Sequence, residues 1–324
     1  MIPSGETPRT FRPASLLLLG LGLLAQPPAS APKPPVPIPG ASGTLVRPDL
    51  VLHYRTLGQG EPVLVLTGGP GFPGGLMEPV AQMIAKKGRA ILPDPRGSGR
   101  SMPKEDAAIT VEGSLSDFEA LRNELGLKQW TVLGCSWGGM LALDYAAKFP
   151  GSLKALVLLD SGGTSWASFG QAFGDNITCR MTAEERAARR FWYQKEEYAR
   201  NPQRAELELL RCILPAYFYD RSKALPFLAG LKEGKESYNP AAGRMDAEYD
   251  KGEGARIEAL AKMRLPALIL HGRQDPLPEA VAMDLNRLLR GSRLILLDRC
   301  GHLAWLEQPD ALEKALLEFL EEVK

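Results

Sequence analysis

A serine able to act as a nucleophile stands in the stretch GCSWGG, which begins at Gly134. Gly134, Ser136 and Gly138 form a Gly-x-Ser-x-Gly pattern between a predicted strand, 129–136, and a predicted helix, 137–150. At such a sharp strand-to-helix turn the serine hydroxyl is exposed, and glycines two residues to either side leave room for the turn. We therefore predict that Ser136 is a nucleophile rather than a small residue in an ordinary turn.

Partners for a catalytic serine stand at two later strand ends. Asp275 follows the predicted strand 266–272 in the sequence HGRQDP, and His302 follows the predicted strand 293–299 in the sequence CGHLAW. A histidine takes and returns a proton near neutral pH, and an aspartate orients it and stabilises its charged form. The chain thus carries the order serine, acid, histidine, and we predict Ser136, Asp275 and His302 as the catalytic residues.

Other residues compete for these roles. Cys135 is a second possible nucleophile, but its side chain would point away from the site at such a turn, so we expect it to be a packing residue. Asp160, at the end of another predicted core strand, is an alternative acid, and Asp298 is a more distant one. His271 is the alternative base, and we expect both it and His53 to be structural.

The predicted strand 62–68 ends in a glycine-rich loop with the sequence LTGGPGF. Gly68, Gly69 and Gly71 leave backbone N–H groups unobstructed, and acyl transfer needs such donors to stabilise the developing oxyanion. An ordinary turn between strand and helix is the alternative interpretation of this loop. Beside the Ser136 turn we predict an oxyanion hole formed by the backbone N–H groups of Gly69 and Trp137.

A charged loop, DPRGSGRS, follows another predicted strand. Asp94, Arg96 and Arg100 could form a charged network that braces the oxyanion loop. The alternative is a set of solvated surface charges.

The elements that position these residues alternate between apolar strands and amphipathic helices. Predicted strands span 50–58, 62–68, 89–97, 129–136, 153–161, 266–272 and 293–299, and predicted helices span 77–88, 114–127, 137–150, 279–289 and 308–322. This pattern indicates a doubly wound, mainly parallel α/β sheet, in which catalytic groups gather at the carboxyl ends of the strands. Residues 162–262 break the pattern with charged helical stretches such as 182–201. We predict a core of 43–161 and 263–324, with 162–262 as an inserted helical cap.

The N-terminal region differs from the rest of the chain. Two arginines precede a continuous apolar run, 14–25, which is too short to span a bilayer comfortably but suits a secretion signal. We predict a signal peptide over 1–31, an exported protein (periplasmic or secreted) and a proline-rich linker over 32–42. Small residues at 29–31 suggest one cleavage site and Ala25 another. An uncleaved anchor and a misassigned start codon are the alternatives.

Composition narrows the function classes. Net charge is +1, from 39 basic and 38 acidic residues, so no nucleic-acid-binding surface is indicated. With three histidines and no Cys-x-x-Cys motif, we expect no metal site and no cofactor. Export would permit a disulfide, and of the four cysteines Cys179 and Cys212 lie in one region and could pair.

These features together resemble the α/β-hydrolase superfamily over roughly residues 43–324. More narrowly GGPG, DPRGSGRS and GCSWGGMLALDYAAKFP look like the proline iminopeptidase group. The resemblance implies an acyl-enzyme mechanism without cofactor, a cap over the site and cap glutamates that bind the free amino terminus of the substrate. The sequence departs from that group at Thr67, where many relatives have histidine. Glu196 and Glu197 are the acids at hand in the cap, and neither is assigned.

The leading hypothesis is a serine hydrolase acting on a small peptide, amide or ester, most similar to a proline iminopeptidase. An esterase of the same fold is the first alternative, because the two enzymes differ in substrate rather than in triad. A non-catalytic binding protein on the same scaffold is the second alternative. A small-molecule or short-peptide substrate is the expected partner; we expect no membrane span in the mature protein, and the sequence gives no oligomeric state.

Overall fold

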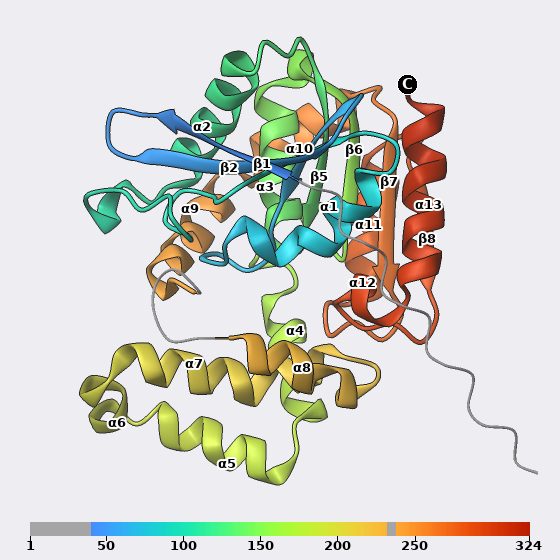
Figure 1. Cartoon of the computed structure of the whole chain (residues 1–324). Helices are drawn as coiled ribbons and strands as arrows, with labels where there is room; N and C mark the ends of the chain where they lie inside the picture. The colour runs from blue at the N-terminus through green and yellow to red at the C-terminus, as the bar shows by residue number, and fades with distance from the viewer. Residues whose placement is uncertain (1–39, 232–237) are drawn as a thin grey trace, which may run out of the picture. The chain divides into compact units, whose positions relative to one another are not determined.

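The described residues form an eight-stranded sheet whose order brings the predicted strand ends together. The computed structural model describes residues 40–231 and 238–324. The strand order is β1-β2-β4-β3-β5-β6-β7-β8. Figure 1 labels β1, β2 and β5 to β8 of this sheet. The strands are β1 (Gly40–Val46), β2 (Val51–Gly58), β3 (Pro62–Leu66), β4 (Arg89–Pro93), β5 (Trp130–Cys135), β6 (Leu153–Leu159), β7 (Ala267–Gly272) and β8 (Arg293–Leu297). From β4 to β8 in this order neighbours are parallel, and β1 and β2 are antiparallel additions, so the predicted mainly parallel sheet is confirmed.

The central strands are buried on both faces because helices cover both sides of the sheet. In β3, Leu64 and Leu66 belong to one apolar cluster, and Val63 and Val65 belong to the other. This alternation follows from the two-residue period of a strand. Most of the helical residues in the two clusters come from α1 (Glu78–Ile84), α2 (Val111–Glu124), α3 (Trp137–Lys148), α10 (Glu253–Lys262), α11 (Glu279–Leu288), α12 (Ala304–Glu307) and α13 (Pro309–Glu322).

The segment predicted as a cap, 162–262, contains helices and no strand among its described residues. Besides α10, its helices are α4 (Gly170–Arg180), α5 (Ala183–Trp192), α6 (Lys195–Arg200), α7 (Pro202–Ile213), α8 (Ala224–Gly230) and α9 (Met245–Lys251). A small apolar cluster lies inside this segment, with Ile177 and Met181 packed on Cys212 and Ala216. That the segment acts as a cap on a separate core remains a prediction.

Element boundaries differ in places from the sequence prediction: β4, for example, ends at Pro93 although the strand was predicted to continue to residue 97. The linker was predicted to reach residue 42, but β1 already begins at Gly40, which pairs with Leu57. The small residues of GASG give no alternating pattern, and at Gly43 the end of the Tyr54 ring occupies the space that a Cβ would take. The helix predicted from residue 114 begins at Val111, since the Thr110 hydroxyl accepts from the Gly113 N–H at 3.0 Å. The predicted helical stretch 182–201 divides into α5 and α6.

Two predictions concern the chain ends and the cysteines. The predicted signal peptide, 1–31, lies outside the described residues, as do residues 32–39 of the predicted linker. Within the described ranges no helix has both the length and the apolar character needed to cross a membrane. All four cysteines are free, with Cys179 exposed and Cys212 buried, so the disulfide that the sequence permitted is not formed.

Candidate active site

Ser136 lies at a strained turn between β5 and α3. Its φ is 54° and its ψ is −119°, a backbone conformation that residues other than glycine rarely adopt. Neighbouring backbone packs so closely that the two flanking positions must be glycine. A Cβ on Gly134 would lie 2.2 Å from the Gly138 carbonyl oxygen, and a Cβ on Gly138 would lie 2.4 Å from the Leu66 carbonyl oxygen. The turn therefore has the geometry that the Gly-x-Ser-x-Gly pattern predicts.

The structure brings His302 and Asp275 into direct contact. Nδ1 of His302 lies 2.7 Å from Oδ2 of Asp275, and the other carboxylate oxygen accepts from the Leu277 N–H at 2.7 Å. Both side chains are buried. The backbone N–H of His302 donates to the Tyr217 carbonyl at 2.7 Å, and the Tyr217 ring packs edge-on against the imidazole with centroids 5.1 Å apart. These contacts fix the imidazole, and its Nε2, which has no hydrogen bond to a described residue, can exchange a proton.

Ser136 lines a cavity of about 100 Å³. Tyr217, which packs on His302, also lines this cavity. The lining residues are Gly69, Pro70, Ser136, Trp137, Met140, Gly162, Trp166, Phe169, Phe173, Tyr217, Asp246 and Leu277. Within the described ranges the Ser136 hydroxyl makes no hydrogen bond, and so none to His302. Such serine–histidine contacts are commonly longer before substrate binds.

The residues predicted for the oxyanion hole, Gly69 and Trp137, both line the Ser136 cavity. Gly69 has a φ of 55°, and Trp137 is the first residue of α3, where backbone N–H groups have no partner within the helix. Neither N–H group donates a hydrogen bond to any described residue. Both donors are thus available to a negatively charged oxygen beside Ser136, which the α3 N-terminus also favours.

Asn239, which sequence reasoning missed, holds the oxyanion loop. Its backbone N–H donates to the Gly71 carbonyl at 3.1 Å, and its side-chain amide donates to the Gly97 carbonyl at 2.9 Å. The side chain is fully buried, and a Cβ on Gly71 would lie 2.1 Å from the Asn239 carbonyl oxygen. No local pattern around Asn239 signals this role, because its partners lie more than 140 residues away in sequence.

Asp246 of α9 is the second residue that sequence reasoning missed. It is the acidic side chain among the residues that line the Ser136 cavity, and those residues include no lysine or arginine. Burial, with a smaller contribution from Asp250, raises the pKa of Asp246 to about 6. Among the described residues it has no hydrogen-bond or ion-pair partner. The acids considered from the sequence, Glu196 and Glu197, do not line the cavity.

Sequence spacing could not single out Asp246 among the acids of MDAEYD. Glu248 accepts from the Val111 N–H at 3.0 Å and so caps α2. Asp250 accepts from the Trp166 N–H at 2.6 Å and so fixes the segment before α4. Only their three-dimensional partners distinguish these two structural acids from Asp246.

Asp160, the alternative acid, lies behind Asp275. Its carboxylate is fully buried, and Oδ1 accepts from the Gly272 N–H at 2.8 Å, while Oδ2 has no hydrogen-bond partner among the described residues. Burial, and then the charge of Asp275, raises the pKa of Asp160 well above its usual value. His271 is also buried, with Nδ1 3.9 Å from Asp160 Oδ1 and Nε2 3.2 Å from the Leu277 carbonyl.

Asp160, His271 and Asp275 present ligand-type atoms that all lie within 4.8 Å of one another. Both oxygens of Asp275 already accept hydrogen bonds, so we assign no metal to this group.

Two further residues were considered from the sequence, Asp298 as an alternative acid and Cys135 as an alternative nucleophile, and their surroundings suit neither role. Asp298 is 82% exposed and pairs with Arg273, and burial raises the pKa of the Cys135 thiol, which keeps that thiol protonated.

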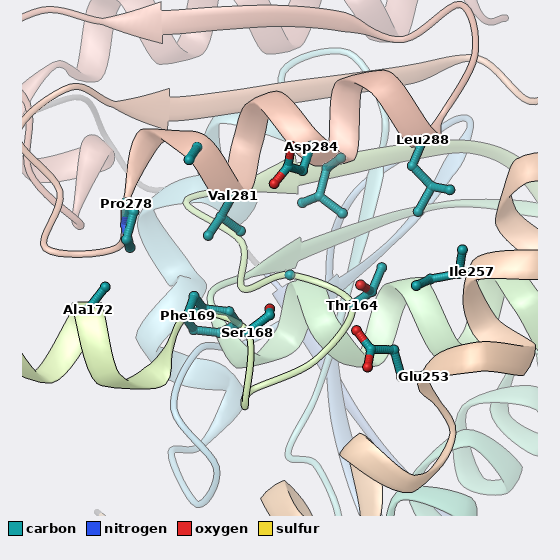
Figure 2. Close-up of a pocket in the computed structure, with 13 residues that line it drawn as sticks. Thr164, Ser168, Phe169, Ala172, Glu253, Ile257, Pro278, Val281, Asp284 and Leu288 are labelled. Carbon is teal, nitrogen blue, oxygen red and sulfur yellow. The ribbon is translucent and has the colours of Figure 1, made fainter.

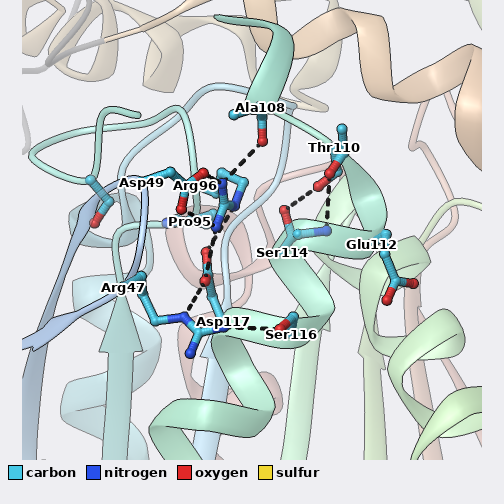
Figure 3. Close-up of polar contacts among 12 residues, drawn as sticks. Arg47, Asp49, Pro95, Arg96, Ala108, Thr110, Glu112, Ser114, Ser116 and Asp117 are labelled. Carbon is cyan, nitrogen blue, oxygen red and sulfur yellow. Dashed lines mark hydrogen bonds and ion pairs between the residues drawn. The ribbon is translucent and has the colours of Figure 1, made fainter. Parts of the chain in front are cut away.

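The predicted network of Asp94, Arg96 and Arg100 is two separate networks. Asp94 accepts from the Gly74 N–H and the Arg100 N–H, each at 3.0 Å, and so connects its own loop to the segment after the oxyanion loop. Arg96 points elsewhere, to Asp117 at 2.9 Å and to Asp49 (Figure 3). The prediction was wrong in placing Arg96 with Asp94, because a buried guanidinium needs buried carboxylates and the fully buried Asp117 supplies one.

A family profile described as the alpha/beta hydrolase fold matches residues 61–309. The chain belongs to the α/β-hydrolase fold family.

The individual proteins that resemble this chain share less than a third of its residues. The chain is similar to the proline iminopeptidase of Lactobacillus helveticus, with 28% identity over 83% of this chain and 94% of the relative. Among solved structures it is similar to a mutant form of the meta-cleavage product hydrolase CumD of Pseudomonas fluorescens IP01, with a TM-score of 0.66, 22% identity and coverage of 86% and 98%. It is also similar to the esterase EaEST from Exiguobacterium antarcticum, with a TM-score of 0.63, 20% identity and coverage of 84% and 96%. These two structures support the fold alone.

Proposed function

We propose that this α/β hydrolase is an exported serine aminopeptidase that removes a small N-terminal residue, such as proline, from short peptides. The observation that carries this proposal is the position of Asp246, a carboxylate in the same small cavity as Ser136. A substrate with a free amino terminus places a positive charge next to the scissile carbonyl. The Asp246 carboxylate would neutralise that charge, and no other residue that lines this cavity carries a negative charge.

In the proposed mechanism the Ser136 hydroxyl attacks the substrate carbonyl while His302 takes its proton. Asp275 holds the imidazole by the 2.7 Å contact at Nδ1 and stabilises the imidazolium. The backbone N–H groups of Gly69 and Trp137 bind the oxyanion. His302 then returns the proton to the leaving amine, and a water hydrolyses the acyl-enzyme by the same steps.

The cavity supports a small residue at the amino terminus. Its volume of about 100 Å³ leaves room for a compact group, and Trp166, Phe169 and Phe173 supply an apolar wall. A proline ring is compact and apolar, and it carries its charge on the adjacent nitrogen. The similarity to proline iminopeptidases supports the same choice.

The test compares proline p-nitroanilide with N-acetylproline p-nitroanilide, which lacks the charge. Wild-type protein should prefer the free amine by at least about 100-fold in kcat/KM, since a buried carboxylate left unpaired disfavours the neutral analogue. Asp246→Asn should reduce that preference by about 10-fold or more. Ser136→Ala should abolish both activities and labelling by a fluorophosphonate. A properly folded wild-type protein that does not label would contradict the catalytic proposal.

The pH dependence gives an independent check. Because the pKa of Asp246 is raised to about 6, the carboxylate is charged above pH 6 and gains a proton below it. The ratio of kcat/KM for proline p-nitroanilide over a neutral p-nitrophenyl ester should fall as the pH drops through 6. Titration of the triad affects both substrates and cancels in the ratio. The ratio should lose this pH dependence in Asp246→Asn.

The second candidate is an esterase, which the aromatic wall of the cavity favours. If the wild-type protein hydrolyses p-nitrophenyl acetate rapidly, cleaves neither anilide, and Asp246→Asn changes nothing, the esterase is the better assignment.

A further inference from the structure

A second cavity, of about 470 Å³, lies next to the Ser136 cavity. Figure 2 shows side chains of α11 on one side of it, opposite those of α10 and of the segment that leads into α4. Val281 projects from α11, Glu253 and Ile257 come from α10, and Ser168 and Phe169 precede α4. Its volume is in the range of small-molecule sites, whereas the Ser136 cavity is several times smaller.

Phe169 is the wall between the two cavities. It lines both, and it is 3% exposed. The wall continues on either side through adjacent residues of the chain. Gly162 lines the Ser136 cavity and Gly163 the second one, and Leu277 and Pro278 are divided in the same way. The two spaces are therefore separated by one aromatic side chain and its immediate neighbours.

Glycine at 162 leaves room for both Met140 and the Phe169 ring. A Cβ on Gly162 would lie 2.5 Å from Sδ of Met140 and 3.1 Å from Cζ of Phe169. The ring packs edge-on against Trp166, with centroids 5.1 Å apart. A turn of the Phe169 side chain about χ1 would remove the part of the wall that its ring forms, since aromatic side chains have alternative staggered rotamers.

The second cavity has one unpaired charge, Glu253, in a lining that is mostly apolar. Val281, Leu285 and Leu288 provide apolar surface, and Asp284 at the rim is paired with Arg287 at 2.5 Å. Glu253 is half-buried and has no hydrogen-bond or ion-pair partner among the described residues. An apolar group that carries a positive charge at its end complements this lining.

We propose that the second cavity receives the distal part of larger substrates, that Phe169 decides whether it is open, and that Glu253 favours a cationic end. This inference rests on the Ser136 hydrolase of the proposed function but not on its aminopeptidase specificity. Substrates whose acyl group exceeds the Ser136 cavity would extend past Phe169 towards α10 and α11. Phe169 is then a specificity-determining residue of this site.

The test uses three p-nitrophenyl esters: the acetate, the 7,7-dimethyloctanoate and the 6-(trimethylammonio)hexanoate. The two long esters have the same shape and differ in one positive charge. Each activity is expressed as kcat/KM relative to the acetate. Phe169→Ala should raise this ratio for both long esters by about tenfold, because removal of the ring joins the two spaces. Phe169→Leu, which removes less buried volume, should raise it by a smaller factor if the alanine variant is poorly folded.

Ile257→Trp is the matched control, because Ile257 is 39% exposed and its replacement fills the second cavity from the rim. In the Phe169→Ala background it should cancel the gain on the long esters. A gain that survives Ile257→Trp would mean that the Ser136 cavity itself had been enlarged, and the inference would be wrong. Acetate hydrolysis without any gain on the long esters would also overturn it and would leave the proposed function intact. Failure of wild-type protein to hydrolyse any of these esters or proline p-nitroanilide would overturn the proposed function as well.

The charge is tested by the ratio of the cationic to the neutral long ester in the Phe169→Ala background. This ratio should exceed one, fall by about 3-fold or more in Glu253→Gln, and persist in Asp246→Asn. A ratio that persists in Glu253→Gln and disappears in Asp246→Asn would overturn the role given to Glu253, because the cation would then remain in the Ser136 cavity.

Discussion

At the scale of single residues, two buried aspartates lie side by side at the candidate triad with different partners. Asp275 contacts His302 at 2.7 Å, whereas Asp160 accepts one backbone N–H, and its second oxygen has no hydrogen-bond partner within the part of the chain that the structure describes. We expect Asp275→Asn to lower kcat by about 10⁴-fold, since the histidine would lose its orienting carboxylate. Asp160→Asn should keep kcat within about tenfold, because burial raises the pKa of Asp160 and an amide resembles the protonated acid.

Ester hydrolysis by both variants, with thermal unfolding as the control for folding, checks this prediction. The pH–rate profile of Asp160→Asn should match that of the wild-type protein. If Asp160→Asn lowered kcat as much as Asp275→Asn does, Asp160 would also be required for catalysis, and the choice between the two acids would be open again.

Asp246 should lower stability at the pH where it acts on substrate. Its native pKa of about 6 is above its usual value of 3.8, so the native state holds a proton that the unfolded chain releases between these values. The stability penalty is therefore absent below about pH 3.8, grows as the pH rises to 6 and is complete above 6. We expect Asp246→Asn to raise the free energy of unfolding by about 1–2 kcal/mol at pH 8, allowing for partial exposure, and by about zero near pH 4.

Urea unfolding at the two pH values measures this difference. Asp284→Asn, which changes an exposed and ion-paired aspartate, is the matched control and should be neutral at both. If Asp246→Asn raised the free energy of unfolding equally at pH 4 and pH 8, the charge of the carboxylate would not be the cause of the increase.

At the scale of elements, the turn from β5 to α3 combines a strained residue with tightly packed glycines. Ser136 has a φ of 54°, which glycine adopts at lower cost than alanine. We expect Ser136→Gly to be more stable than Ser136→Ala by about 1 kcal/mol, although both should be inactive. Urea unfolding of the two variants gives the comparison, and equal stabilities would mean that the backbone relaxes at this turn once the hydroxyl is absent.

The same turn explains why so much of the site could be predicted from local patterns. This strand-to-helix turn requires glycine two residues before and two residues after the serine, because backbone carbonyl oxygens occupy the space that a Cβ would take there. The strand ends that carry Asp275 and His302 are apolar runs followed by polar loops, and a parallel sheet brings such ends together. These signals lie within a few residues of the side chains that they predict.

At the scale of the molecule, the residues that sequence reasoning missed are those whose roles depend on distant segments. Asn239 reaches Gly97 across 142 residues, and Asp246 is identified only by the cavity that it shares with Ser136. Arg96 was placed with the wrong acid for the same reason, because its partner Asp117 comes from α2 and not from its own loop. No period or spacing within one helix could have signalled these contacts.

The edge of the sheet is another feature that only the assembled fold reveals, and it leads to a prediction for the whole molecule. β1 covers β2, pairing from Gly40 with Leu57 to Val46 with Val51. A chain that begins at Arg47 should be less stable than one that begins at Gly40 by about 1–2 kcal/mol, which corresponds to roughly 2–8 °C in Tm. Its uncovered β2 edge should also promote association between molecules, as unpaired edge strands do.

Thermal unfolding and size-exclusion chromatography of these two chains isolate the contribution of β1, because they differ in that strand alone. The Arg47 chain should elute partly as larger species at high concentration, and the Gly40 chain should not. Activity per folded molecule should be similar in both, since β1 lies at the far end of the strand order from β7 and β8, which precede Asp275 and His302. Equal stability and equal elution would mean that β1 contributes no net free energy to the fold, despite its continuous pairing with β2.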